Sequence, residues 1–134
     1  DIAEGTELPE LVFPVTASAI AVGAIATNDY ETVHHDKAAA EATGVPNIFM
    51  NILTTNGLVQ RFVGAWAGPE ARVRKIRIKL GAPNFAGDTM RINGTVSRVD
   101  PATGEVDVAV FGRNGIGEHV GATVTLHFPE RSAA

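Results

Sequence analysis

The chain of 134 residues contains no cysteine. This absence excludes a disulfide framework, a thiolate nucleophile and a cysteine-ligated zinc, so stability has to come from packing within the chain or against a partner. Histidine is scarce as well, and only His34 and His35 are near one another in the sequence. Because adjacent residues suit a single metal ion poorly, we expect no metal site.

Neither an excess of one charge nor a long apolar run is present. The formal charge is −4, with 11 basic and 15 acidic residues, which argues against a protein that mainly neutralises nucleic-acid phosphates. No apolar run approaches the ~18 residues that span a bilayer, and the N-terminal segment lacks the basic start and apolar centre of a signal peptide. We therefore expect a cytoplasmic protein with no nucleic-acid and no membrane partner.

An apolar content of 45% over this length is enough for one well-buried core, so we predict a single domain over residues 1–134. Residues 1–14 contain two prolines and predict an irregular lead-in. Residues 15–27 are small, apolar and tolerant of β-structure, which favours a strand buried on both faces. This strand would run straight into Asn28 and Asp29.

Two helices are expected next. Residues 36–43 open with an N-cap residue and are rich in alanine, which predicts a short helix that stops at Gly44. Residues 47–66 have apolar side chains at helical spacing on more than one face, which is typical of a buried helix. Gly57 and Gly64 are costly inside a helix, so we expect another backbone to approach closely there.

The second half of the chain alternates with period two and predicts four strands. Their inward-facing residues are Ile76, Ile78 and Leu80; Met90, Ile92 and Val96; Val106, Val108 and Val110; and Val120, Ala122, Val124, Leu126 and Phe128. An antiparallel sheet curled around one central helix buries that helix with so few residues, so the pattern predicts an α+β hot-dog fold. A generic α+β roll is the alternative.

Asp29 and His34 are the residues best suited to acid/base chemistry. Both lie between the expected strand and the short helix, where a carboxylate and an imidazole can converge on one water molecule. An imidazole titrates near neutrality and a carboxylate is a strong acceptor, so the pair could remove a proton from water and return one to carbon. Ordinary turn and capping roles are the alternative reading of the same two residues.

The segment N-D-Y-E-T-V-H-H-D-K-A-A-A, residues 28–40, resembles the motif G-D-x-N-P-(aliphatic)-H-x5-(A/S) of MaoC-like (hydratase-2 type) enoyl-CoA hydratases. The matching positions are Asp29, Val33, His34 and Ala40, and the departures are Asn28, Glu31 and Thr32. Residues 80–89 and 111–124 are similar to later parts of the same family. The resemblance implies a hot-dog fold in which Asp29 and His34 are the catalytic pair.

Within this family, the segments V-H-H-D, N-I-L-T-T-N-G-L-V-Q-R-F-V and G-R-N-G-I-G-E-H-V resemble the small subunits of actinobacterial steroid side-chain enoyl-CoA hydratases. The resemblance implies a steroid enoyl-CoA thioester as the substrate, in steroid or cholesterol degradation. It also implies a larger MaoC-like partner subunit with a zinc-ribbon and OB-type domain, which forms a heterotetramer with this chain. An aldolase would associate through the larger subunit.

The resemblance further implies an oxyanion donor at the start of the central helix, where the position aligns with the backbone N–H of Asn51. A helix N-terminus suits a developing enolate oxygen whatever the side chain at that position is. Covering the helix entry is the alternative role of Asn51. Asn56 is a polar residue on an apolar helix, and we expect it either to bind substrate or to satisfy a buried neighbour.

The expected reaction is the addition of water to the conjugated double bond, with Asp29 and His34 holding the water between them. It requires no cofactor beyond the coenzyme A of the substrate itself. Two other functions are compatible with the sequence: a non-catalytic hot-dog subunit that supports the active site of its partner, and a hot-dog acyl-CoA thioesterase.

Overall fold

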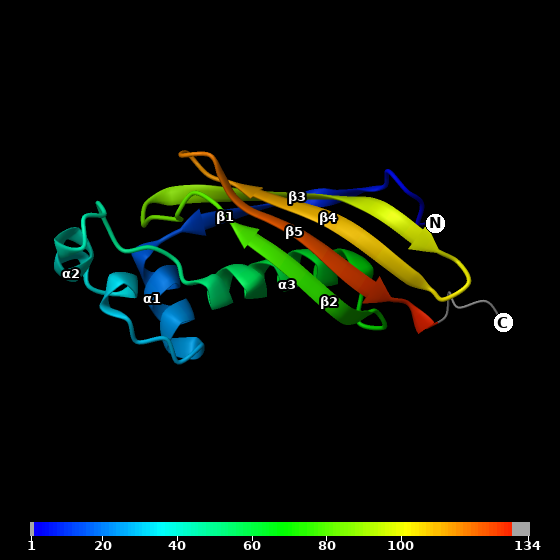
Figure 1. The fold of residues 1–134 in the computed structure, drawn as a ribbon, viewed down its shortest axis with the longest axis horizontal. Helices are drawn as coiled ribbons and strands as arrows, with labels where there is room; N and C mark the ends of the chain where they lie inside the picture. Colours follow the sequence, from blue (N-terminus) through cyan, green and yellow to red (C-terminus); the bar gives the residue numbers. More distant parts are fainter. Residues whose placement is uncertain (1, 130–134) are drawn as a thin grey trace.

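The alternating half of the chain forms the four strands that the sequence predicts (Figure 1). They are β2 (Arg72–Leu80), β3 (Asp88–Asp100), β4 (Glu105–Arg113) and β5 (Glu118–His127). The computed structural model describes residues 2–129, so the ends of the expected domain at residue 1 and residues 130–134 lie outside the described part. Gly104, at φ +76°, closes the tight turn between the antiparallel strands β3 and β4.

A fifth strand, β1 (Glu7–Val15), corrects the expectation of an irregular lead-in over residues 1–14. It pairs antiparallel with β3, and the sheet order is β1-β3-β4-β5-β2. The two prolines suggested irregular structure, but proline is tolerated on an edge strand, where one side of the backbone has no strand partner. Leu11, Phe13 and Val15 supply the alternation of this strand.

Residues 15–27 do not form the predicted strand; most of them form helix α1 (Ala17–Ala26). Alanine has the highest helix propensity, and five of the ten residues of α1 are alanine. Thr16 caps the helix, because its side chain accepts a hydrogen bond from the N–H of Ala19. A short apolar segment fits both a buried strand and a helix, and here the cap and the alanines favour the helix.

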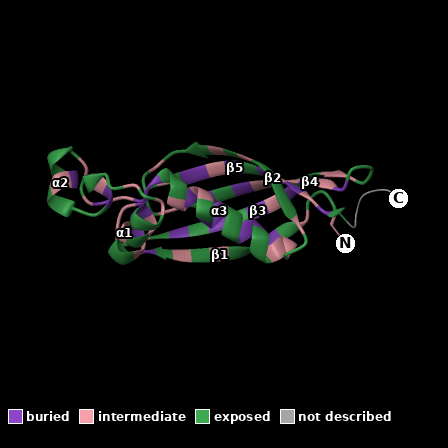
Figure 2. Ribbon diagram, turned by 90° about the horizontal axis from the view of Figure 1, so that it is seen from below, coloured by how far each residue is buried: buried purple, intermediate pink, exposed green. Residues whose placement is uncertain are grey.

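Helix α3 (Ile52–Ala67) lies across the concave face of the sheet (Figure 2). Its buried face consists of Leu58, Val59, Phe62 and Val63, which join the inward side chains of the strands in one hydrophobic core. The helix begins five residues later than predicted, because Asn51 occupies the N-cap position. This arrangement of sheet and helix confirms the hot-dog fold. No helix within residues 2–129 is long and apolar enough to cross a membrane.

Helix α1 packs against the first turns of α3 at Gly23. A Cβ atom at Gly23 would lie 2.4 Å from Oγ1 and 2.9 Å from Cγ2 of Thr54, so only glycine allows this approach. The close approach expected at Gly57 and Gly64 is not found in the described part of the chain, where a Cβ at either position would meet nothing within 4 Å. The tight helix contact is therefore made at the end of α3 that also carries Asn51.

Replacing Gly23 with alanine is expected to lower the free energy of unfolding by about 1–3 kcal/mol, because the new methyl group overlaps the Thr54 side chain. Gly57→Ala is the matched control: it adds the same group inside a helix but in open space, and it should stabilise by about 0.5–1 kcal/mol. Urea unfolding of the three proteins measures both changes. Equal effects of the two substitutions would contradict the close contact at Gly23.

Candidate active site

Asp29 is held by the end of helix α1. Asn28, the residue after the C-cap, has a left-handed conformation with φ +56°, which asparagine tolerates better than most residues. The N–H of Asn28 donates to the carbonyl of Ile25, and the N–H of Asp29 donates to that of Ala24 at 2.8 Å. This pair of bonds is a Schellman motif. The glycine of the family motif is thus replaced here by an asparagine in a conformation that glycine adopts readily.

His34 is fixed by contacts with Phe49. It ends the short 3-10 helix η1 (Thr32–His34), just before helix α2 (Lys37–Ala42), and only 7% of the residue is exposed. Its Nδ1 lies 2.7 Å from the carbonyl oxygen of Phe49, and the two rings pack edge to face with centroids 5.0 Å apart. Since a carbonyl only accepts, Nδ1 carries the proton that makes this bond. The other nitrogen, Nε2, is therefore the one available for chemistry.

Nε2 of His34 faces Oδ2 of Asp29 at 3.3 Å. With Nδ1 protonated, a neutral ring presents a lone pair at Nε2, and the ionised carboxylate presents another. Two acceptors at this distance suit a molecule that donates to both, and water has two O–H groups for that purpose. The structure thus brings together the two residues that the sequence selected, in a geometry that can bind and deprotonate water.

The side chain of Asn51 contacts Asp29 directly. Its Nδ2 donates to Oδ2 of Asp29 at 3.1 Å, and the N–H of Glu31 donates to Oδ1 of the same carboxylate at 3.3 Å. The hydrogen bond from Asn51 is the largest influence on Asp29, and it holds the pKa of that carboxyl below its usual value. Asp29 is therefore ionised at neutral pH, as a proton acceptor has to be.

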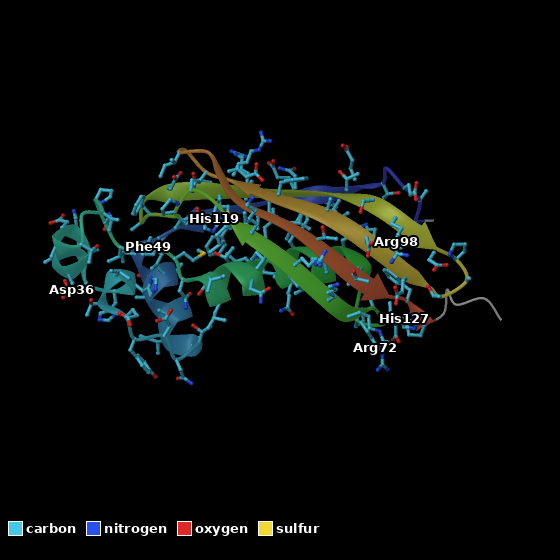
Figure 3. The ribbon with its side chains drawn as sticks, viewed as in Figure 1. Asp36, Phe49, Arg72, Arg98, His119 and His127 are labelled. Carbon is cyan, nitrogen blue, oxygen red and sulfur yellow. The ribbon has the colours of Figure 1, made fainter. Side chains whose placement is uncertain are left out.

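A mostly apolar cavity of about 300 Å³ lies beside the pair. It is lined by His34, Phe49, Met50, Asn51, Ile52, Leu80, Gly81, Pro83 and His119. Asp29 is not one of the lining residues, but it contacts two of them, His34 and Asn51. Phe49 and His119 mark this region in Figure 3, at the end of the sheet where α3 begins.

The other two residues selected from the sequence differ in position. Asn51 lines the cavity as the N-cap of α3, and its backbone N–H makes no hydrogen bond to any residue between 2 and 129. Asn56 lies farther along α3 and does not line this cavity. Its side-chain oxygen is buried and accepts no hydrogen bond within the described residues, so the binding of substrate by Asn56 stays a prediction.

His119 also lines the cavity. The sequence did not indicate this residue, because strict alternation along β5 would place it on the outer face. Its Nδ1 donates to the carbonyl of Ala82 at 2.6 Å, and its Nε2 accepts from the hydroxyl of Thr55 at 2.9 Å. These bonds join β5, the loop after β2 and helix α3. Burial lowers the pKa of His119, and the neutral ring satisfies both partners.

A family model described as "MaoC like domain" matches residues 4–113, and the chain belongs to this family. It is 47% identical over 122 residues to the 3-oxo-4,17-pregnadiene-20-carboxyl-CoA hydratase beta subunit of Mycobacterium tuberculosis, covering 91% of this chain and 93% of that protein. The expected family is thus confirmed.

Two solved structures illustrate the range of the similarity. A chain in the crystal structure of the ChsH1-ChsH2 complex from Mycobacterium tuberculosis superposes with a TM-score of 0.92 at 44% identity, covering 96% of this chain and 99% of that one. The (R)-hydratase from A. caviae involved in PHA biosynthesis has a TM-score of 0.88 at 17% identity, covering 96% and 98% of the two chains. The second match concerns the fold alone.

The lowered pKa of His119 predicts a pH dependence of stability. A histidine whose pKa is lower in the folded state contributes stability that is present above its ordinary pKa of about 6.5 and is lost as the pH falls below it. The free energy of unfolding should fall by up to about 1.4 kcal/mol per pH unit in this range. Urea unfolding between pH 7.5 and 5 measures the slope, and His119→Gln should reduce it. An unchanged slope in this variant would assign the effect to other groups.

Proposed function

We propose that the chain is a catalytic subunit of an enoyl-CoA hydratase, with Asp29 and His34 as its acid/base pair. The observation that carries the proposal is the 3.3 Å approach of Asp29 Oδ2 to His34 Nε2 beside an apolar cavity and the N-terminus of α3. Conjugate addition of water needs a proton acceptor for the water, a proton donor for carbon and an oxyanion donor for the thioester carbonyl. This end of the fold contains groups suited to each task.

In the proposed reaction, Asp29 and His34 accept the two O–H groups of the attacking water. As the oxygen forms a bond to the β-carbon, one water proton passes to Asp29, and the electrons of the double bond move into the thioester carbonyl. The resulting enolate then takes up a proton at the α-carbon from the same acid/base pair. The net change is the addition of one water molecule, and the side chains return to their starting protonation states without a metal or redox cofactor.

The backbone N–H of Asn51 is the proposed donor to the enolate oxygen. It stands at the N-terminus of α3, where the helix dipole favours negative charge. A well-placed donor of this kind contributes about 3 kcal/mol to transition-state stabilisation. The side chain of Asn51 points its amide at Asp29, so only the backbone of this residue is assigned to the carbonyl.

A steroid side-chain enoyl-CoA thioester is the proposed substrate. Support comes from the 47% identical relative, whose name specifies a steroid-derived acyl-CoA. A cavity of about 300 Å³ lies at the small end of ligand pockets and would hold the reacting end of such a molecule rather than four rings. Large apolar side chains stay exposed on the elements that carry the site: Val22, Ile25, Tyr30, Ile52, Leu53 and Leu80.

A larger MaoC-like subunit is the proposed partner, with a zinc-ribbon and OB-type domain through which an aldolase would associate. The similar solved structure is a complex of two proteins, ChsH1 and ChsH2. In this chain, β1 and β2 are both edge strands, each with a single strand neighbour in the described sheet. Pairing at such an edge and covering of the exposed apolar residues would complete the substrate site, and a heterotetramer of two such pairs is the proposed assembly.

The substitutions Asp29→Asn and His34→Ala test the catalytic assignment. Each is expected to lower kcat for hydration by about 10²–10⁴-fold, which is the usual contribution of a general acid or base. Assays quenched at fixed times measure the rate at which each variant hydrates a steroid enoyl-CoA thioester, and circular dichroism checks that the variant is folded. His35→Ala, a substitution at the neighbouring exposed histidine, is the matched control and should retain activity. Turnover like that of the unmodified protein in a folded Asp29→Asn variant would remove the assignment.

Assembly should determine both activity and substrate range. The chain purified with its larger subunit is expected to hydrate the steroid thioester, whereas the chain alone should form dimers or aggregates in light scattering and show little hydration of that substrate. Hydration rates of the steroid thioester and of crotonyl-CoA are compared. Because both substrates use the same acid/base pair, a difference between their rates reports on the apolar walls of the site. A stable monomer that hydrates the steroid substrate unaided would contradict the proposed assembly.

A further inference from the structure

We propose that the side chain of Asn51 is a positioning residue for Asp29, and that it couples the orientation of this carboxylate to the N-terminus of helix α3. The inference rests on the proposed hydration, in which Asp29 accepts a proton from water. It adds a role for the side chain of Asn51, because only the backbone N–H of this residue takes part in that reaction. Four hydrogen bonds carry it.

The contacts of Asn51 determine which way its amide group points. Its Oδ1 accepts from the N–H of Thr54 at 3.2 Å, and also from the Thr54 hydroxyl. A backbone N–H can only donate, so the atom facing it has to be the oxygen. The amide nitrogen is therefore on the other side, where it meets Oγ1 of Thr27 at 2.9 Å and Oδ2 of Asp29 at 3.1 Å.

Thr27 reinforces this orientation. Its hydroxyl donates to backbone carbonyls at the end of α1, those of Gly23 at 2.8 Å and Ala24 at 3.1 Å. Because its single proton is used there, Oγ1 is left as an acceptor for Asn51. Both hydrogens and both acceptor positions of the Asn51 amide are thus engaged, in a residue that is 2% exposed. A different rotamer would leave buried polar groups unpaired, so the amide has one favourable position.

The consequence for Asp29 is both geometric and electrostatic. Asn51 and His34 contact the same oxygen, Oδ2, so the amide holds this oxygen at the side where the imidazole lies. The bond also lowers the pKa of Asp29, as described above. In the family motif an asparagine follows the aspartate two positions later, and here Glu31 occupies that position. Asn51 supplies an amide to the carboxylate from a different element.

Asn51→Asp separates positioning from helix capping. Aspartate caps a helix as well as asparagine does, and the backbone N–H is retained, but an oxygen replaces the amide that donates to Asp29. Two facing carboxylates raise the pKa of Asp29, so the acidic limb of the kcat/KM profile should move to higher pH by about one unit or more. At neutral pH, kcat should fall by about 10- to 100-fold, which is less than the loss expected when the base itself is removed.

Two further variants complete the test, which uses the full chain with its larger subunit. Asn51→Ala removes both the cap and the donor, so it should lower the unfolding midpoint and also move the acidic limb upward, by less than Asn51→Asp. Thr16→Ala removes the cap of α1 at the end of that helix remote from Asp29, and it should lower the midpoint while leaving kcat and the pH profile unchanged.

The outcomes distinguish this inference from the proposed function. If Asp29→Asn is inactive and Asn51→Asp retains both kcat and the acidic limb of the unmodified enzyme, the positioning role is overturned while the hydratase proposal stands. If Asp29→Asn is itself active, the hydratase proposal fails first. A reduced kcat with a displaced acidic limb in Asn51→Asp, at an unfolding midpoint close to that of the unmodified protein, supports the positioning role.

Discussion

The burial of helix α3 against one curled sheet is the constraint on which the rest of the structure depends. A five-stranded sheet of this size has a single concave face, and α3 fills it with Leu58, Val59, Phe62 and Val63. Burying a side chain of this size contributes about 1.5–3 kcal/mol, so the axial and rotational position of the helix is strongly determined. The position of its N-terminus is determined with it, and every group of the candidate site contacts that terminus or the segments packed against it.

The site combines groups with opposite requirements within one small region. The cavity is largely apolar, whereas Asp29 has to remain ionised next to it. The Asn51 amide and the Glu31 N–H meet this requirement by donating to the carboxylate. The Phe49 carbonyl holds a proton of His34 on Nδ1, the ring nitrogen that faces away from Asp29. Thus the polar network keeps Asp29 ionised and determines which ring nitrogen of His34 faces it.

The sequence predicts those parts of the molecule in which local pattern and tertiary environment agree. Strict alternation identifies β2 to β5, and the family resemblance of the segment around Asp29 and His34 selects these residues as the proposed catalytic pair. Helix α1 is missed because a short segment of alanine and aliphatic residues fits a buried strand equally well, although Thr16 and Asn28 are recognisable cap residues. The contacts of Asn51 and His119 depend on how α1, α3 and β5 meet in space, which no periodicity encodes.

Asp29 and His34, the proposed acid/base pair, each have a main anchor outside the segment that joins them. Asp29 takes its backbone position from the carbonyl of Ala24 at the end of α1, and His34 takes its position from Phe49. Selection on the intervening residues can therefore be relaxed, provided that their number is conserved. Over evolution, the composition of this loop can therefore change while the chemistry is retained. Relatives are better recognised by the length of this segment and by its two anchors than by the identities of its residues.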